Sequence, residues 1–305
     1  MNIYKTSFPN SSMEKCLVMV SGGLDSKLAC KIMQEQTEVE AIFFILPFSG
    51  GCCSDKFCVF KFCQQEKIKL HIVDCTKGKL LQEYLNMLRN PKHGRGTALN
   101  PCRDCHIFMM KKAKELADSL KIKIIATGEV LGERPFSQTR HALTLIDKKI
   151  GFEIIRPLSA KLMLETSWEK SNLLERNKFY DIVGRRRTKQ LELAKKYNIS
   201  APPVGGGCVL CDPQYCDKLK PILNSNLTYQ DIQLIKIGRH IEGIILSRNE
   251  KEGNLLLSQA GIKIIPQDNP GPTALIKNKN DIEKAKELIK KYSKHKIEEF
   301  DIKKE

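Results

Sequence analysis

The sequence predicts an α/β protein, with a doubly wound parallel sheet followed by a smaller α+β domain. Over roughly the first 130 residues, short apolar runs typical of buried parallel strands alternate with segments of helical period. A Gly-containing turn directly follows the first run, where such folds bind ligands. Beyond residue 227, short strand-like runs are instead separated by Gly and Pro turns. The length of 305 residues fits this division into two domains.

The expected elements of the first domain follow one another in regular order. The pattern predicts strands at 16–20, 41–46, 70–73 and 123–126, and helices at 26–33, 55–66, 79–88 and from near Pro101 to Leu120. Ligands of such a sheet lie at the carboxyl ends of its strands. We therefore expect chemistry in the turns that follow residues 20 and 126.

The second half of the chain has a different pattern. After about Leu164 it becomes helical and strongly basic, and the Pro- and Gly-rich segment 202–207 is the best candidate linker. Farther on, strands are predicted at 241–246 and 255–257, followed by a last helix with Ile282, Ala285, Leu288 and Ile289 on one face. We therefore predict three regions: a nucleotide-binding domain at 1–165, a basic, Cys-containing connector at 166–225, and a small α+β domain at 226–305.

Charge indicates the class of partner. The 51 Lys and Arg residues outnumber the 35 Asp and Glu residues, which gives a net charge of +16 and favours a polyanion such as nucleic acid or a nucleotide. No apolar run approaches the ~20 residues of a membrane-spanning helix, and the polar start lacks a signal-peptide core. A cytoplasmic protein without a membrane partner is expected.

The 12 cysteines need a separate interpretation. In a reducing cytosol, a chain of this length uses cysteines as metal ligands, catalytic thiols or small core residues more than as disulfides. Cys16, Cys30 and Cys75 lie in apolar patterns and are expected in the core. A group made of Cys52, Cys53, Cys58 and Cys63 has no zinc-like spacing, and its role stays open.

The turn after the first strand has the composition of a phosphate-binding loop. It consists of Ser21, Gly22, Gly23, Leu24, Asp25 and Ser26. Glycines let the backbone approach an anion, the amides of the following helix point at it, and serine hydroxyls add donors. The loop has neither the Gly-Lys-Ser/Thr of a Walker loop nor the Gly-x-Gly-x-x-Gly of a dinucleotide fold.

Ser-Gly-Gly-x-Asp-Ser at this place resembles the PP-loop of the ATP pyrophosphatases, whose domain is adenine nucleotide alpha hydrolase-like. Those enzymes adenylate a substrate and release pyrophosphate. The segment 100–106 resembles the Asn-Pro-x-x-x-Cys segment of tRNA 2-thiouridine synthetases, which implies that Cys105 is the reactive cysteine. Thr127-Gly128 resembles the Thr-Gly after their AMP-binding strand. The resemblance implies ATP on Ser21–Ser26, Thr127 and Gly128, with Mg²⁺ near Asp25.

Further segments are similar to a bacterial ThiI-like or MnmA-like subgroup of tRNA thiouridine synthetases. They are 128–138, 156–161 and 206–208, the last followed by Asp212-Pro213, and the likeness covers residues 15–220. The subgroup has Thr where this chain has Cys211. Residues 236–240 and 248–250 resemble, more weakly, the RNA-binding module of NFACT-type proteins.

Two cysteine pairs predict a metal centre. Cys102 and Cys105 are one helical turn apart, and Cys208 and Cys211 repeat that spacing. Spacing alone favours a zinc site with all four cysteines. The family resemblance instead implies a [4Fe-4S] cluster on Cys102, Cys105 and Cys208, with one iron open for sulfide. A metal-free pair of catalytic thiols, with a persulfide on Cys105, is the third alternative.

A basic stretch is the candidate RNA contact. Residues 176–196 contain eight Lys or Arg and two acidic residues, and they include Arg185, Arg186 and Arg187. These three arginines are predicted to bind the tRNA backbone.

Together, these features predict an ATP-dependent tRNA uridine thiolase. A uridine carbonyl oxygen attacks the α-phosphate of ATP, pyrophosphate leaves, and free sulfide or a persulfide carrier then displaces AMP to give 2- or 4-thiouridine. One alternative is a PP-loop adenylase or amidotransferase for a small molecule, which would not bind tRNA. The other is a non-enzymatic, zinc-bearing RNA-binding protein, which would not release pyrophosphate.

Overall fold

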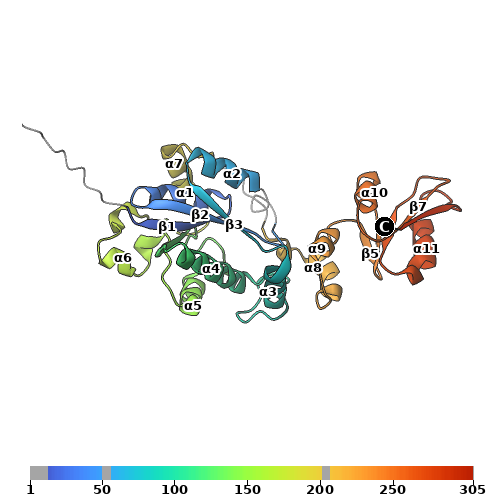
Figure 1. Ribbon diagram of the computed structural model, residues 1–305, viewed down its shortest axis with the longest axis horizontal. Helices are drawn as coiled ribbons and strands as arrows, with labels where there is room; N and C mark the ends of the chain where they lie inside the picture. Colours follow the sequence, from blue (N-terminus) through green and yellow to red (C-terminus); the bar gives the residue numbers. More distant parts are fainter. Residues whose placement is uncertain (1–12, 50–55, 201–206, 305) are drawn as a thin grey trace, which may run out of the picture. The chain divides into compact units, whose positions relative to one another are not determined.

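The computed structural model describes residues 13–49, 56–200 and 207–304 (Figure 1). The chain forms two compact units, the first ending at Pro213 and the second running from Gln214 to Glu305. The division lies within the segment 166–225 that was predicted as a connector. Most of the predicted linker 202–207 lies outside the described residues.

A four-stranded parallel sheet forms the centre of the first unit, as predicted. Its order is β3-β2-β1-β4, with β1 (Lys15–Val20), β2 (Glu38–Ile45), β3 (Lys69–Asp74) and β4 (Ile124–Thr127). Met19 pairs with Thr127 and Val20 with Phe43, so the last residues of β1 and β4 meet at one edge. The two turns expected to carry chemistry therefore start side by side.

Helices cover both faces of this sheet (Figure 1). Along β1, Val18 belongs to an apolar cluster with Leu28 of α1, whereas its neighbour Leu17 packs with Met110 of α4, since successive strand residues point to opposite faces. Cys16, Cys30 and Cys75 are fully buried in these clusters, as predicted. The helices are α1 (Leu24–Gln34), α2 (Lys56–Gln65), α3 (Gly78–Arg89), α4 (Cys102–Ser119), α5 (Arg140–Ile150), α6 (Ser167–Lys170) and α7 (Thr188–Lys196).

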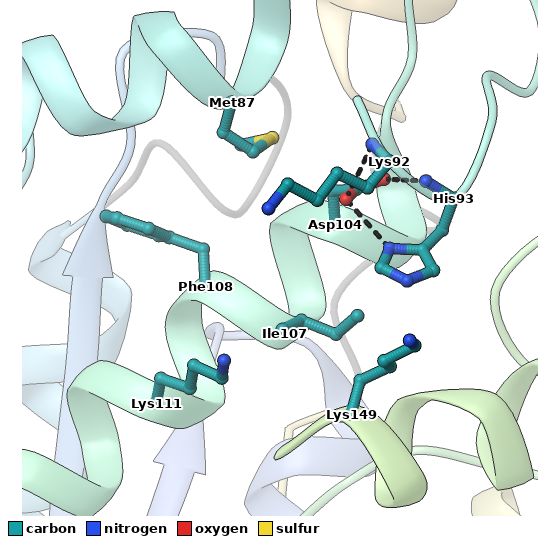
Figure 2. A pocket seen from close by; sticks show the side chains of 8 residues that line it. All are labelled: Met87, Lys92, His93, Asp104, Ile107, Phe108, Lys111 and Lys149. Atoms are coloured by element: carbon teal, nitrogen blue, oxygen red, sulfur yellow. Dashed lines mark hydrogen bonds and ion pairs between the residues drawn. The ribbon is translucent and has the colours of Figure 1, made fainter. Parts of the chain in front are cut away.

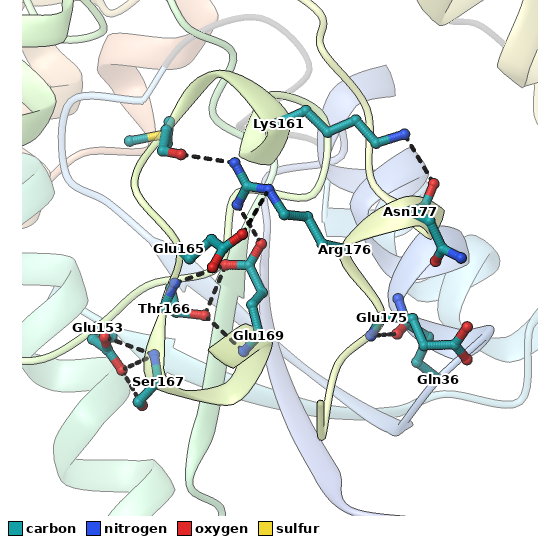
Figure 3. A network of polar contacts seen from close by, with 11 residues as sticks. Gln36, Glu153, Lys161, Glu165, Thr166, Ser167, Glu169, Glu175, Arg176 and Asn177 are labelled. Carbon is teal, nitrogen blue, oxygen red and sulfur yellow. Dashed lines mark hydrogen bonds and ion pairs between the residues drawn. The ribbon is translucent and has the colours of Figure 1, made fainter. Parts of the chain in front are cut away.

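The segment around α6 is less helical than predicted and is held by a polar network (Figure 3). Buried Glu169 accepts a hydrogen bond from Arg176 at 2.6 Å, and it forms a capping box with Thr166. Arg176 also donates to the Met163 carbonyl at 2.8 Å. Because its guanidinium is used inside this network, Arg176 contributes to folding rather than to the free basic surface.

The second unit is an α+β domain with an antiparallel sheet in the order β5-β6-β8-β7-β9. Its helices are α8 (Pro213–Leu219), α9 (Tyr229–Leu234), α10 (Glu250–Leu257) and α11 (Ile282–Tyr292). Its strands are β5 (Arg239–Ile241), β6 (Ile244–Leu246), β7 (Ile262–Pro266), β8 (Ala274–Ile276) and β9 (Phe300–Lys304). Ala285 and Ile289 of α11 are buried, as the helical pattern predicted.

Three expectations for this unit were wrong. The predicted strand 241–246 is a hairpin, because Glu242 and Gly243 both adopt positive φ and reverse the chain. The predicted strand 255–257 is the end of α10, whose first turn is fixed by the Asn249 side chain accepting from the Glu252 amide. The chain also does not end in a helix, since β9 follows α11 and pairs with β7. None of the helices in the described part of the chain is long and apolar enough to cross a membrane.

Candidate functional site

The loop between β1 and α1 is closed by its own serines. Ser26 Oγ donates to the Gly23 carbonyl at 2.9 Å, and the Ser21 amide donates to Ser26 Oγ at 3.2 Å. Gly22 has φ 84°, a conformation that favours glycine. The Asp25 Oδ1 atom is buried and has no hydrogen-bond partner among the described residues. The loop is thus preformed, with one acceptor unused.

The start of the turn after β4 packs directly on this loop. A Cβ atom built on Gly128 would lie 2.5 Å from the backbone nitrogen of Ser26, which is closer than real Cβ contacts. Only glycine fits there without movement of the α1 backbone. The structure therefore brings together all the residues that were expected to bind ATP, from Ser21–Ser26 and from Thr127-Gly128.

The three arginines predicted to bind RNA do not share one environment. Arg185 and Arg186 are exposed, whereas Arg187 is half-buried at the amino end of α7. Burial raises the pKa of Asp25, and the positive charge of Arg187 opposes that rise. The charge of Arg187 therefore acts on Asp25 of the phosphate loop.

Two further polar residues near this loop were missed by the sequence reasoning. Gln190, one turn after Arg187, is fully buried, and neither of its amide atoms has a partner among the described residues. Burial and the neighbouring Asp25 raise the pKa of Glu133. No local pattern marks Gln190, because its position depends on α7 packing against α1. Glu133 lies in the turn between β4 and α5, within the segment 128–138.

The two cysteine pairs converge from distant segments. Cys102 and Cys105 lie in the first turn of α4, and Cys208 and Cys211 flank the 3₁₀ turn Val209–Cys211. Two hydrogen bonds join the segments, from the Leu99 amide to the Leu210 carbonyl at 3.1 Å and from Asn100 Nδ2 to Cys211 Sγ at 2.8 Å. The two pairs therefore form one thiol site.

Tyr84 of α3 reaches into this site. Its hydroxyl is 3.3 Å from Cys105 Sγ, and it interacts electrostatically with Cys102 and Cys208 as well. Burial raises the pKa of Cys105, and the neighbouring thiols raise it further. Burial likewise raises the pKa of Cys102. Without a cation the thiols are held in their neutral form, and thiolates need a metal or another positive charge.

The four cysteines offer only sulfur donors, which limits the kinds of metal centre that they can bind. Sulfur-only donor sets suit zinc and iron–sulfur centres. Among the described residues, no group of three or more His, Cys, Asp or Glu side chains is placed to hold a metal ion. The sulfur-only donor set itself suits either a zinc ion or an iron–sulfur cluster.

One cysteine of the group left open lies at the phosphate loop. Lys27 Nζ donates to Cys58 Sγ at 3.2 Å, and that thiol donates to the Gly22 carbonyl at 3.8 Å. Cys63 is a core residue whose burial raises its pKa to about 11. Cys52 and Cys53 lie outside the described residues.

A buried ion network links the phosphate loop to the thiol site. Glu129, two residues after β4, accepts from Arg156 Nε at 2.8 Å and is 2.6 Å from His106 Nδ1, beside Cys105. Arg156 also binds Asp147 of α5 at 2.7 Å. Burial alone would raise the pKa of Glu129, but the charge of Arg156 and the His106 hydrogen bond lower it to about 2. The network fixes β4, α4 and α5 relative to one another.

Comparisons with known proteins agree with this geometry in the first unit. Residues 11–161 match the family model described as "Thiamine biosynthesis protein (ThiI)". The chain is similar to the "Probable tRNA sulfurtransferase" of Mycoplasmopsis pulmonis, at 26% identity over 72% of this chain and 50% of the relative. It is also similar to the "tRNA sulfurtransferase" of Blochmanniella pennsylvanica, at 31% identity over 50% of this chain and 30% of that one.

The chain spans about half the length, or less, of these curated relatives. Among solved structures, a "U34-tRNA thiolase NcsA from Methanococcus maripaludis with its [4Fe-4S] cluster" is 20% identical, covering 76% of this chain and 74% of that one, with a TM-score of 0.37. That score is too low to establish a shared fold.

Proposed function

We propose that the chain is an ATP-dependent tRNA uridine thiolase, because residues 11–161 match the ThiI family model. The observation that carries the proposal is the pairing of two sites in one unit. A preformed phosphate loop lies at the edge of the sheet, and a thiol site lies at the start of α4. The Glu129 network joins them, because it contacts both β4 and His106.

The first half-reaction uses the phosphate loop. The amides at the start of α1 and the hydroxyls of Ser21 and Ser26 bind the phosphates of ATP. Asp25, with its unpartnered oxygen, is the ligand for Mg²⁺, which neutralises the phosphates. The uridine carbonyl oxygen bonds to the α-phosphorus, the bond to the β-phosphate oxygen breaks, and pyrophosphate leaves.

The second half-reaction takes place at the thiol site. Sulfide forms a bond to the activated ring carbon, and AMP leaves with the former carbonyl oxygen. Cys102, Cys105 and Cys208 are the ligands of a [4Fe-4S] cluster, which supplies an open coordination position for sulfide when it is bound. Cys211 is left out of this set because the tRNA thiouridine synthetases that this chain resembles have Thr at its position.

The RNA substrate is recognised by positive charge. Arg185 and Arg186 are exposed and form no ion pair with a described residue, so both are available for phosphates. The charge of Arg187 acts on Asp25, so this residue serves the nucleotide more than the RNA backbone. The target base leaves its stack to reach the site.

The proposed function is tested by measuring both of its products, pyrophosphate and thiouridine, in one reaction. The full chain, purified without oxygen, is incubated with ATP, Mg²⁺, sulfide and unmodified tRNA, and pyrophosphate and thiouridine are measured, the latter by mass spectrometry. We expect both products, and their loss in Asp25→Ala and Ser26→Ala, with tRNA affinity unchanged. Cys63→Ser, a core change away from the loop, serves as the matched control. Pyrophosphate without tRNA dependence would indicate a small-molecule adenylase, and tRNA binding without pyrophosphate a non-enzymatic RNA-binding protein.

A further inference from the structure

A cavity of about 440 Å³ lies beside the thiol site and is not used by the proposed reaction (Figure 2). It is bounded by the end of α3, the loop that follows, one face of α4 and the end of α5. Its volume is within the range of small-ligand sites. All of its walls belong to the first unit.

Unpaired positive charge surrounds the cavity. Lys92 from the loop, Lys111 from α4 and Lys149 from α5 all line it, and none forms an ion pair with a described residue. Figure 2 shows their side chains arranged around the same space. The next lysine of α4 behaves differently, since Lys112 is paired with Glu83 and Glu115 at 3.1 Å. Charge has therefore been left unpaired on the face of α4 that borders the cavity.

The one acidic residue of the wall is already occupied. Asp104 is buried, and its carboxylate accepts the Lys92 amide at 3.1 Å, the His93 amide at 2.9 Å and a hydrogen bond from His93 Nδ1 at 2.9 Å. These bonds hold the loop on the first turn of α4. They also satisfy most of the acceptor capacity of Asp104. Three lysines face this one carboxylate, which leaves the cavity with a surplus of positive charge.

The floor of the cavity is apolar. Met87, Ile107 and Phe108 contribute to it, and Phe108 also packs edge-on against Tyr84, with ring centroids 5.6 Å apart. Tyr84 in turn contacts Cys105, so the floor is connected to the thiol site. Cations around an aromatic and aliphatic floor suit a ligand with a phosphate and a flat base, which single-stranded RNA presents at every nucleotide.

We propose that this cavity binds one nucleotide of the RNA substrate, its phosphate contacted by Lys92, Lys111 and Lys149 and its base resting on Phe108. The inference rests on the proposed function, because it takes the RNA to be the substrate. It places a recognition point on the same helix as the reactive cysteine. Phe108 lies one turn after Cys105, so RNA held here is close to the thiols.

The experiment measures tRNA affinity of the full chain over a series of salt concentrations. In a Lys92→Ala, Lys111→Ala, Lys149→Ala triple variant, we expect the slope of log affinity against log salt to fall by about 0.7 to 0.9 unit, since the three lysines together neutralise one phosphate. Lys112→Ala, the matched control with a paired charge, should change neither slope nor affinity. Phe108→Ala should weaken binding about tenfold with an unchanged slope, as expected for one lost base stack.

Measurements of ATP binding and of free UMP binding distinguish failure of the cavity proposal from failure of the proposed thiolase function. ATP binding should be unaffected in the triple variant, so lost tRNA binding with intact ATP binding supports the cavity. An unchanged slope in the triple variant, while the wild type binds tRNA, overturns the inference but not the thiolase. Failure of the wild type itself to bind tRNA overturns both. Binding of free UMP that is lost in the triple variant, with tRNA affinity intact, would assign the cavity to a free nucleotide and reject RNA.

Discussion

The phosphate loop and the thiol site are built in different ways. The phosphate loop is local, with six successive residues closed by their own hydrogen bonds and completed by Gly128. The thiol site is not, because its cysteines come from two segments about a hundred residues apart, joined through Leu99 and Asn100. Each arrangement suits its task. A phosphate is bound by backbone amides that any strand-to-helix turn offers, whereas a metal centre needs side chains gathered from several directions.

The largest effect is expected from closing the approach between β4 and α1. Gly128→Ala places a methyl group 2.5 Å from the Ser26 nitrogen, and the contact is with backbone that cannot rotate away. We expect ATP binding to be lost and the free energy of unfolding to fall by about 3 kcal/mol. Calorimetric titration and chemical denaturation measure the two quantities.

The control for this change is Gly207→Ala, since its added Cβ meets no atom within 4 Å. Its stability and ATP affinity should equal those of the wild type. Wild-type ATP affinity in Gly128→Ala would show that the phosphate loop tolerates displacement. The conclusion that Gly128 completes a preformed loop would then be wrong.

The next effect concerns the two cysteines of the distant segment. Cys208→Ser should lose the metal centre, whereas Cys211→Ser should keep it, because Cys211 is not one of the three proposed ligands. Iron, sulfide and zinc are measured on protein purified without oxygen, and about four irons per chain are expected in the wild type and in Cys211→Ser. One zinc per chain that disappears with Cys211 would refute the cluster and make Cys105 a structural ligand. Protein without any metal would make Cys105 a persulfide carrier.

A third change tests the link between the two sites. Glu129→Gln leaves buried Arg156 with Asp147 as its one carboxylate partner, and we expect a loss of about 3 kcal/mol of stability at pH 7. The folded-state pKa of Glu129 is about 2, below its unfolded value, so its contribution is complete above about pH 4.5 and is lost as the pH falls toward 2. Denaturation at several pH values should show the variant and wild type converging in that window. A difference that does not depend on pH would contradict the charge pairing.

The smallest effect separates the arginines. Arg185→Ala with Arg186→Ala should lower the salt slope of tRNA binding by about 2 units at most and leave ATP affinity intact. Arg187→Ala should do the reverse, weakening ATP binding by a few-fold, because its charge faces Asp25. Equal behaviour of the two variants would indicate that Arg187 contacts the RNA rather than the nucleotide.

Local features of the fold could be predicted from the sequence. The four parallel strands and the phosphate loop follow from apolar runs and one glycine turn, and both carry their signal within a few residues. The errors in the second unit arose where apolar residues were given more weight than turn and cap signals. The Glu242-Gly243 turn splits one apolar run into a hairpin, and the Asn249 cap turns another into a helix.

Long-range pairings were partly predictable. The spacing of the cysteines indicated that Cys102, Cys105, Cys208 and Cys211 belong together, because metal chemistry constrains spacing. The direction of Arg187 and the partnership of Glu129 with Arg156 carry no such constraint. They depend on helices packing across the sheet, which neither composition nor periodicity specifies.

The hydrogen bond from the Leu99 amide to the Leu210 carbonyl also bears on how the protein is made. It closes a loop of more than a hundred residues, and contacts of such sequence separation form late because the chain entropy must be lost first. On the ribosome, the phosphate loop can take shape soon after the first strands emerge, whereas Cys208 is synthesised long after Cys102 and Cys105. Nascent chains therefore pass through a stage in which the phosphate loop is formed but the proposed cysteine ligands are not yet together. With those ligands, metal loading would be confined to chains whose first unit is complete.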